Sequence, residues 1–303
     1  MIVILGPTAT GKTQLATQLA TLINAEIISA DSRQVYRGMD IGTGKDIAEY
    51  TVNEQEIPYH LIDIADAGEE YNVYRFQKDF LNAYNEVQTK GKLPILCGGT
   101  GMYIDAVLNG YRLVNVPENG SLRIKLERKN QDELIDILAA YKKLHNTSDT
   151  KDNPRLIRAI EIAEYYKKHN NEIEEFPKIK SLVFGVYYDR NKNRERITDR
   201  LQHRLDNGMI EEVENLLKQD NITEEILEYY GLEYKYISRY LLNKLEYRDM
   251  FDKLNTSIHQ FAKRQMTWFR RMEKQGRKIY WVNGEIPMED KIGQIMESLA
   301  KFN

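Results

Sequence analysis

The 303-residue sequence contains one cysteine, Cys97, and five histidines. A single cysteine excludes a disulfide within the chain and any zinc site built from several cysteines. The histidines are scattered without the spacing of metal ligands, so any bound metal must be held by oxygen atoms. A chain without disulfides suits a reducing compartment, and we expect a cytoplasmic protein.

Long apolar runs and a strong charge of either sign are also missing. No run approaches the roughly 18 apolar residues of a membrane-spanning helix, and the apolar start MIVIL is too short for the core of a signal peptide. The net charge is -3, whereas general nucleic-acid binders are usually basic. We therefore expect no membrane association, and we expect any polynucleotide contact to be made through local basic patches. We also predict a monomer.

Apolar stretches bounded by turn residues predict five strands. They span residues 1–5, 25–31, 92–99, 181–189 and 278–283. Helical patterns separate them, which indicates crossover connections and a parallel sheet between two helical layers. The predicted fold class is therefore α/β, a three-layer core with a parallel sheet.

Two segments between the predicted strands are charged and favour helices. Residues 114–179 are too long for one crossover, so we expect a helical insertion domain there. The catalytic core would then be discontinuous, made of residues 1–113 and 180–303, with a second helical block at 191–275 inside it.

Residues 6–13 read GPTATGKT and match G-x-x-x-x-G-K-[ST] between a predicted strand and a predicted helix. This motif, the P-loop, is typical of P-loop NTPase-like folds, and its backbone N–H groups surround phosphate oxygens. Lys12 would reach a terminal phosphate, and the hydroxyl of Thr13 would bind Mg²⁺. The expected phosphate-binding residues are Gly6, Pro7, Thr8, Ala9, Thr10, Gly11, Lys12 and Thr13. The motif indicates a bound diphosphate or triphosphate but not the reaction.

Two polar residues follow neighbouring predicted strands. Asp31 ends the second strand and Thr100 follows the third, and open α/β sheets place ligand contacts at such strand ends. Each residue alone is also explained as a turn or helix cap. Together they favour a site beside the phosphate loop.

Three basic patches stand out from the acidic average. In the helix predicted to contain 255–274, an apolar face is opposed by a basic face. The apolar residues are Phe251, Leu254, Ile258, Phe261, Trp268 and Met272, and the basic ones are Lys263, Arg264, Arg270, Arg271 and Lys274. Arg155 and Arg158 occupy the first turns of another predicted helix, where the helix dipole disfavours cations, so they gain from a polynucleotide backbone or from partners such as Asp152 and Glu161.

The third patch is Arg196, Arg200 and Arg204, spaced four residues apart on a predicted helix. Such a row resembles the arginine-bearing lid of phosphate-transferring P-loop enzymes. It equally fits a surface stripe compensated by Glu195 and Asp199.

Several segments together resemble the tRNA dimethylallyltransferases, also called tRNA isopentenyltransferases. They are GPTATGKT, SADSRQVYRGMDIGTGK (29–45), YHLIDI (59–64), GGTGMY (98–103), NPRLIRAIE (153–161) and FAKRQMTWFR (261–270). They occur in the family's order and span nearly the whole chain. The resemblance implies transfer of the dimethylallyl group from dimethylallyl diphosphate to N6 of adenosine 37, beside the tRNA anticodon, with diphosphate leaving.

The resemblance also implies residue roles. Asp31 would accept a hydrogen bond or proton from the adenine amine, Thr100 would help position that nucleotide, and Lys12 with Mg²⁺ would neutralise the leaving diphosphate rather than hold ATP. The residues implied to contact the anticodon stem-loop of tRNA are Asp31, Ser32, Arg33, Gln34, Thr100, Arg123, Pro154, Arg155, Leu156, Ile157 and Arg158.

Some positions depart from the family pattern. The family commonly has serine at Thr10 and often alanine at Gly44, and its GYKE-like segment reads GLEYKY at 231–236, so no role is transferred there. Three other readings stay open at this point: a P-loop small-molecule kinase, a prenyltransferase acting on free adenine nucleotides, and a nucleotide-dependent RNA-binding module.

Overall fold

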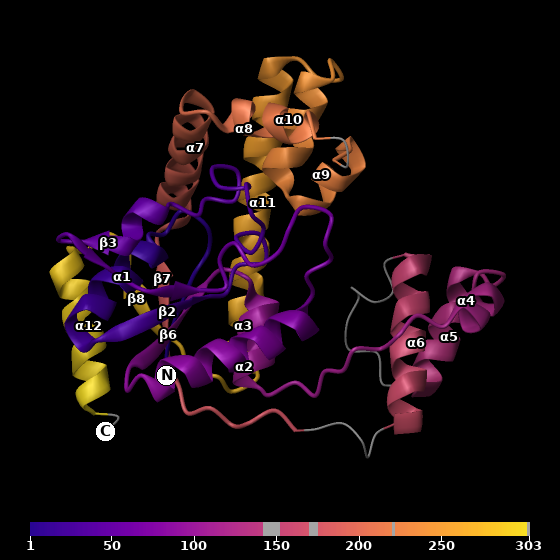
Figure 1. Ribbon diagram of the computed structural model, residues 1–303, viewed down its shortest axis with the longest axis horizontal. Helices are drawn as coiled ribbons and strands as arrows, with labels where there is room; N and C mark the ends of the chain where they lie inside the picture. The colour runs from indigo at the N-terminus through magenta and orange to yellow at the C-terminus, as the bar shows by residue number, and fades with distance from the viewer. Residues whose placement is uncertain (142–151, 170–174, 220–221, 302–303) are drawn as a thin grey trace. The chain divides into compact units, whose positions relative to one another are not determined.

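The computed structural model describes residues 1–141, 152–169, 175–219 and 222–301 (Figure 1). The chain divides into two compact units. The first combines Met1–Asn109 with Lys178–Asn303, and the second is Gly110–Pro177. The predicted insertion at 114–179 includes residues 142–151 and 170–174, which lie outside the described residues, as do 220–221 in the predicted helical block.

A six-stranded parallel sheet forms the centre of the first unit, in the order β5-β2-β6-β1-β7-β8. Its strands are β1 (Ile2–Leu5), β2 (Ala25–Ser29), β5 (Tyr59–His60), β6 (Leu93–Gly98), β7 (Leu182–Tyr187) and β8 (Tyr280–Asn283). The parallel sheet and the α/β class are therefore confirmed. β5 was not among the predicted strands, because a strand of two residues has no readable alternation.

Helices cover both faces of this sheet. On one face, α1 (Lys12–Ile23) and α12 (Met288–Ala300) share a core with alternate strand residues; this core includes Ile2, Ile4, Leu15 and Ile295. On the other face, α2 (Val73–Thr89) and α3 (Gly101–Leu108) contact β6. Because both faces are buried, the central strands are continuously apolar rather than alternating.

The remaining part of the first unit is mostly helical. The segment between β7 and β8 forms α7 (Arg190–Asp206), α8 (Met209–Leu217), α9 (Glu224–Tyr230), α10 (Leu232–Leu241) and α11 (Tyr247–Lys274). A 3-10 helix, η1 (Ile47–Tyr50), precedes a small hairpin of β3 (Thr51–Val52) and β4 (Gln55–Glu56). No helix in the described ranges is long and apolar enough to cross a membrane.

The second unit contains α4 (Gly120–Leu126), α5 (Gln131–Tyr141) and α6 (Asn153–His169). These helices bury a small apolar core of their own. It consists of Leu126, Leu134, Leu138, Leu156, Ile157, Ala159 and Ile160. Leu156 and Ile157, which the family resemblance implied as tRNA contacts, therefore belong to this core.

Candidate active site

The phosphate-loop motif connects β1 to α1. Gly11, in a left-handed conformation (φ 72°), precedes the helix and offers no side-chain cap, so the first N–H groups of α1 have no capping side chain. The Thr10 hydroxyl donates to the Pro7 carbonyl at 2.9 Å and fixes the loop internally. A helix N-terminus prepared in this way favours an anion.

Lys12 lies inside this loop. Its ammonium group donates to the Pro7 carbonyl at 2.7 Å, and burial lowers the pKa of Lys12 to about 8. A dehydrated ammonium group interacts more strongly with an arriving phosphate than a hydrated one. Thr13, predicted to bind Mg²⁺, lines the same cavity as Lys12.

Asp31 and Thr100 both lie at the carboxyl-terminal end of the parallel strands, because β2 and β6 are neighbours in the sheet. A Cβ atom on Gly98, the last residue of β6, would lie 2.3 Å from the Ala30 carbonyl oxygen, so glycine permits this close approach. The Thr100 hydroxyl accepts from the Ser32 N–H at 3.0 Å and does not cap α3. Thr100 therefore ties the chain after β6 to the chain after β2.

Asp31 performs a turn function and also reaches the cavity. One carboxylate oxygen accepts from the Arg33 N–H at 2.9 Å, and the side chain lines the same cavity as the phosphate loop. The alternatives considered for Asp31, turn residue or ligand contact, are thus compatible with each other.

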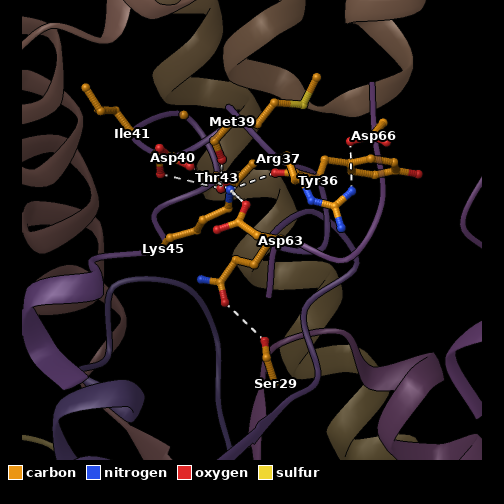
Figure 2. Close-up of polar contacts among 12 residues, drawn as sticks. Ser29, Tyr36, Arg37, Met39, Asp40, Ile41, Thr43, Lys45, Asp63 and Asp66 are labelled. Atoms are coloured by element: carbon orange, nitrogen blue, oxygen red, sulfur yellow. Dashed lines mark hydrogen bonds and ion pairs between the residues drawn. The ribbon is translucent and has the colours of Figure 1, made fainter. Parts of the chain in front are cut away.

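The loop from residue 34 to residue 45 is fixed by buried polar contacts. Gln34 accepts from the Ser29 hydroxyl at 3.1 Å and donates to the Gly44 carbonyl at 2.8 Å. Figure 2 shows the fully buried Lys45 donating to the Tyr36 carbonyl, to Asp40 and to Asp63. Gln34 also lines the same cavity as Asp31, so these internal bonds are compatible with the predicted contact to the nucleotide, which stays a prediction.

Gln265, on α11, is a site residue that sequence reasoning missed. Its side-chain oxygen accepts from the Thr8 N–H at 2.9 Å, and its NH₂ group donates to the Gly99 carbonyl at 2.9 Å. Gln265 thereby joins the phosphate loop to the end of β6. A polar residue in the buried stripe of a helix was the available signal.

The buried face of α11 also differs from the predicted one. Ala262 and Phe269 are buried on it, whereas Phe261, predicted to pack on the apolar face, is 39% exposed and lines the cavity. The prediction for Phe261 was wrong. Its position on the apolar stripe borders the cavity rather than another helix.

The arginine row on α7 faces the phosphate loop. Arg196 donates to the Ala9 carbonyl at 2.9 Å, and Arg200 lies 3.4 Å from the Thr8 hydroxyl. Arg200 also pairs with Asp46 at 2.7 Å, and Arg204 reaches the same carboxylate at 3.4 Å. The row is therefore part of the site, and its side chains do not form a separate surface stripe.

Many of these groups border one cavity of about 780 Å³. The phosphate loop, Asp31, the arginine row and Phe261 line it, together with Gly231 to Lys235 from the divergent GLEYKY segment. The cavity combines an anion-binding loop, a carboxylate and an apolar side chain. It can hold a charged phosphate group and an apolar group next to a hydrogen-bond acceptor.

Arg123, Arg155 and Arg158 of the second unit are paired within that unit. Glu161 binds Arg123 at 3.0 Å and also binds Arg158, while Arg155 pairs with Asp152 at 3.3 Å. Burial acts to raise the pKa of Glu161, but hydrogen bonds from Arg123, the Asn119 N–H and Arg158 outweigh it and lower the pKa to about 2. The unfavourable helix position of Arg155 and Arg158 is therefore explained by these carboxylates. Pro154 occupies the first turn of α6.

Comparison with known families decides the classification. A family model described as IPP transferase matches residues 34–272, and one described as isopentenyl transferase matches residues 1–57. The chain belongs to the IPP transferase family. The two matches together contain the phosphate loop, Asp31, Thr100 and Gln265.

Curated relatives of this IPP transferase match along its full length. It is 57% identical over 302 residues to tRNA dimethylallyltransferase 2 of Bacteroides fragilis, covering 100% of this chain and 98% of the relative. It is 53% identical to tRNA dimethylallyltransferase 1 of Parabacteroides distasonis, covering 99% and 97%.

Solved structures agree with this family assignment. The tRNA isopentenylpyrophosphate transferase of Bacillus halodurans has a TM-score of 0.71 at 31% identity, over 99% of this chain and 95% of that one. A eukaryotic dimethylallyltransferase, described as acting on tRNA, has a TM-score of 0.77 at 28% identity, over 94% and 73%. The IPP transferase fold thus extends over both units of the chain.

Proposed function

We propose that this protein transfers the dimethylallyl group from dimethylallyl diphosphate to N6 of adenosine 37 in tRNA. The observation that carries the proposal is the single cavity in which the phosphate loop and Asp31 lie together, in a chain that is 57% identical to a tRNA dimethylallyltransferase. A kinase would need the same loop. However, neither the relatives of this chain nor the apolar Phe261 at the cavity favours phosphoryl transfer.

In the proposed reaction the bond between the allylic carbon and the diphosphate oxygen breaks, and a bond from N6 to that carbon forms. The diphosphate leaves with the electron pair of the broken bond. Lys12, the N–H groups of the loop and the arginine row neutralise the charge that develops on it. The loop thus holds the leaving diphosphate, and no phosphoryl group is transferred.

The amine loses one proton as the new bond forms. The second carboxylate oxygen of Asp31 accepts it, while the first keeps its hydrogen bond from the Arg33 N–H. An adenine amine is a weak nucleophile and a carboxylate is a weak base, so the main role proposed for Asp31 is to orient the amine, with proton acceptance as the bond to carbon forms. Thr100 acts through Ser32, whose N–H it holds.

Mg²⁺ is proposed as the cofactor, held by the Thr13 hydroxyl. The described residues contain no group of three or more histidine, cysteine, aspartate or glutamate side chains arranged for a metal. A single hydroxyl ligand from Thr13 fits Mg²⁺, which keeps several waters and binds through substrate phosphates with one or two protein oxygens. When bound, Mg²⁺ would withdraw negative charge from the leaving diphosphate.

The tRNA would present its anticodon stem-loop, with the reactive base flipped out of the stack into the cavity. The proposed contacts near the base are Asp31, Ser32, Arg33, Gln34 and Thr100. Those on the second unit are Arg123, Pro154, Arg155 and Arg158, since Leu156 and Ile157 are buried in its core. Arg123 and Arg158 could contact RNA while keeping Glu161 as a partner. We propose that the enzyme works as a monomer in the cytoplasm.

The test uses Asp31→Asn, which keeps the acceptor for the Arg33 N–H and removes the carboxylate. With Mg²⁺, labelled dimethylallyl diphosphate and unmodified tRNA, kcat should fall by about 10²- to 10⁴-fold. The tRNA Kd should change less than about two-fold. Asp290→Ala, at an exposed position on α12, is the control. Label appearing in free adenine nucleotides instead of tRNA would refute the proposed function.

A further inference from the structure

The guanidinium group of Arg204 fills the space that a side chain at Gly44 would need. Gly44 has a left-handed backbone (φ 68°), and a Cβ atom built on it would lie 1.8 Å from Nη2 of Arg204 and 2.6 Å from Nη2 of Arg200. Atoms cannot approach this closely. The guanidinium group of Arg204 therefore lies where any side chain at position 44 would have to be.

The loop that carries Gly44 is fixed in place. Glu212, on α8, accepts from the N–H groups of Asp40, Ile41 and Gly42 at 2.7 to 3.0 Å. The Gly44 carbonyl accepts from Gln34 at 2.8 Å, and the next residue is the buried Lys45. A side chain at position 44 would therefore displace Arg204 rather than the loop.

The two guanidinium groups share one carboxylate. Arg200 and Arg204 both pair with Asp46, although the Arg204 side chain is only 12% exposed. Burial, followed by the charge of Arg200, lowers the pKa of Arg204 to about 10, so Arg204 remains a cation at neutral pH. Glu233 also interacts with Arg204, but burial raises the pKa of Glu233. Two close cations with one partly exposed carboxylate partner are arranged to accept a further anion.

We propose that Arg204, seated on Gly44, binds a phosphate oxygen of the diphosphate together with Arg200, and that glycine at position 44 admits it. The proposal rests on the function proposed above. Arg200 lies 3.4 Å from the Thr8 hydroxyl of the phosphate loop, and all three groups line the same cavity. This location favours the diphosphate over a backbone phosphate of the tRNA as the anion.

A matched pair of glycine variants tests the arrangement. Gly38 has φ 70°, and a Cβ atom built on it meets no atom within 4 Å. Gly44→Ala and Gly38→Ala therefore introduce the same left-handed strain, and only the first displaces Arg204. Arg204→Met removes the donors without touching the loop, and it keeps the test valid if Gly44→Ala folds poorly.

The probe is inorganic pyrophosphate with Mg²⁺, titrated into each variant by calorimetry. The pyrophosphate Kd should rise at least about ten-fold in Arg204→Met and in Gly44→Ala, and stay near the wild-type value in Gly38→Ala. In the double variant, Gly44→Ala should add little to Arg204→Met, because both changes remove the same contact.

An unchanged pyrophosphate Kd in Arg204→Met would overturn the proposal. A loss of tRNA affinity with unchanged pyrophosphate binding would also overturn it, since Arg204 would then serve the tRNA backbone. Failure of the proposed function is distinguishable from both results. In that case the wild-type protein would bind pyrophosphate and depend on Arg204, yet transfer no label to tRNA.

Discussion

Replacing Gln265 by leucine should destabilise the first unit and weaken diphosphate binding. Gln265 is 7% exposed, and its two hydrogen bonds reach the Thr8 N–H and the Gly99 carbonyl, each at 2.9 Å. Leaving both backbone groups buried without a partner costs about 1–3 kcal/mol each. Leucine regains part of this through apolar contacts, so we expect a loss of about 2–4 kcal/mol.

For a unit of this size, that loss lowers Tm by about 4–16 °C. Calorimetric unfolding measures it, and the KM for dimethylallyl diphosphate reports the displaced loop. Gln265→Glu separates the two bonds, because it keeps the acceptor for Thr8 and loses the donor to Gly99. It also buries a charge, so it should destabilise at least as much as leucine at neutral pH.

Lys263→Ala, at an exposed position on the same helix, is the control and should stay within about 0.5 kcal/mol of the wild type. If Gln265→Leu unfolds at the wild-type temperature, the two hydrogen bonds contribute nothing net. The reasoning would then be refuted.

Two further predictions concern buried charges. Lys45→Met leaves Asp40 and Asp63 without their shared cation. Because both carboxylates are partly exposed, we expect the free energy of unfolding in urea to fall by about 2–4 kcal/mol and the rate of transfer to fall with it. An unchanged unfolding free energy and transfer rate would contradict the role given to Lys45. Burial acts to raise the pKa of Glu26, but hydrogen bonds from His60, Lys92 and Lys90 outweigh it and lower the pKa from 4.5 to about 2. The stabilisation by Glu26 is therefore complete above about pH 4.5 and lost as the pH falls toward 2. The difference in unfolding free energy between wild type and Glu26→Gln, at most about 3 kcal/mol, should shrink between pH 7 and pH 3.5, and a constant difference would contradict it.

Features set by neighbouring residues could be predicted from the sequence. The strand, phosphate loop and helix at the start of the chain depend on contiguous residues, so their positions were readable. Thr100 was placed correctly at a strand end, but its partner Ser32 lies 68 residues away. Local patterns predict that the site lies at the carboxyl-terminal end of the strands. They do not identify which side chains contact one another there.

Features set by distant contacts could not be predicted. Gln265 binds residues 257 and 166 positions away, and no motif relates them. Phe261 follows the apolar period of its helix, but periodicity does not tell whether that face meets another helix or a cavity. In each case the missing information was the tertiary neighbour.

The contact between Thr8 and Gln265 also constrains when the site can be completed during synthesis. The phosphate loop leaves the ribosome first, but its partner on α11 follows 257 residues later. At roughly 5–20 residues per second, the loop waits about 13–50 s for that partner. Glu212, which holds the loop before Lys45, is likewise made late. The nascent amino-terminal segment therefore carries the phosphate-loop sequence well before it can hold a finished binding site.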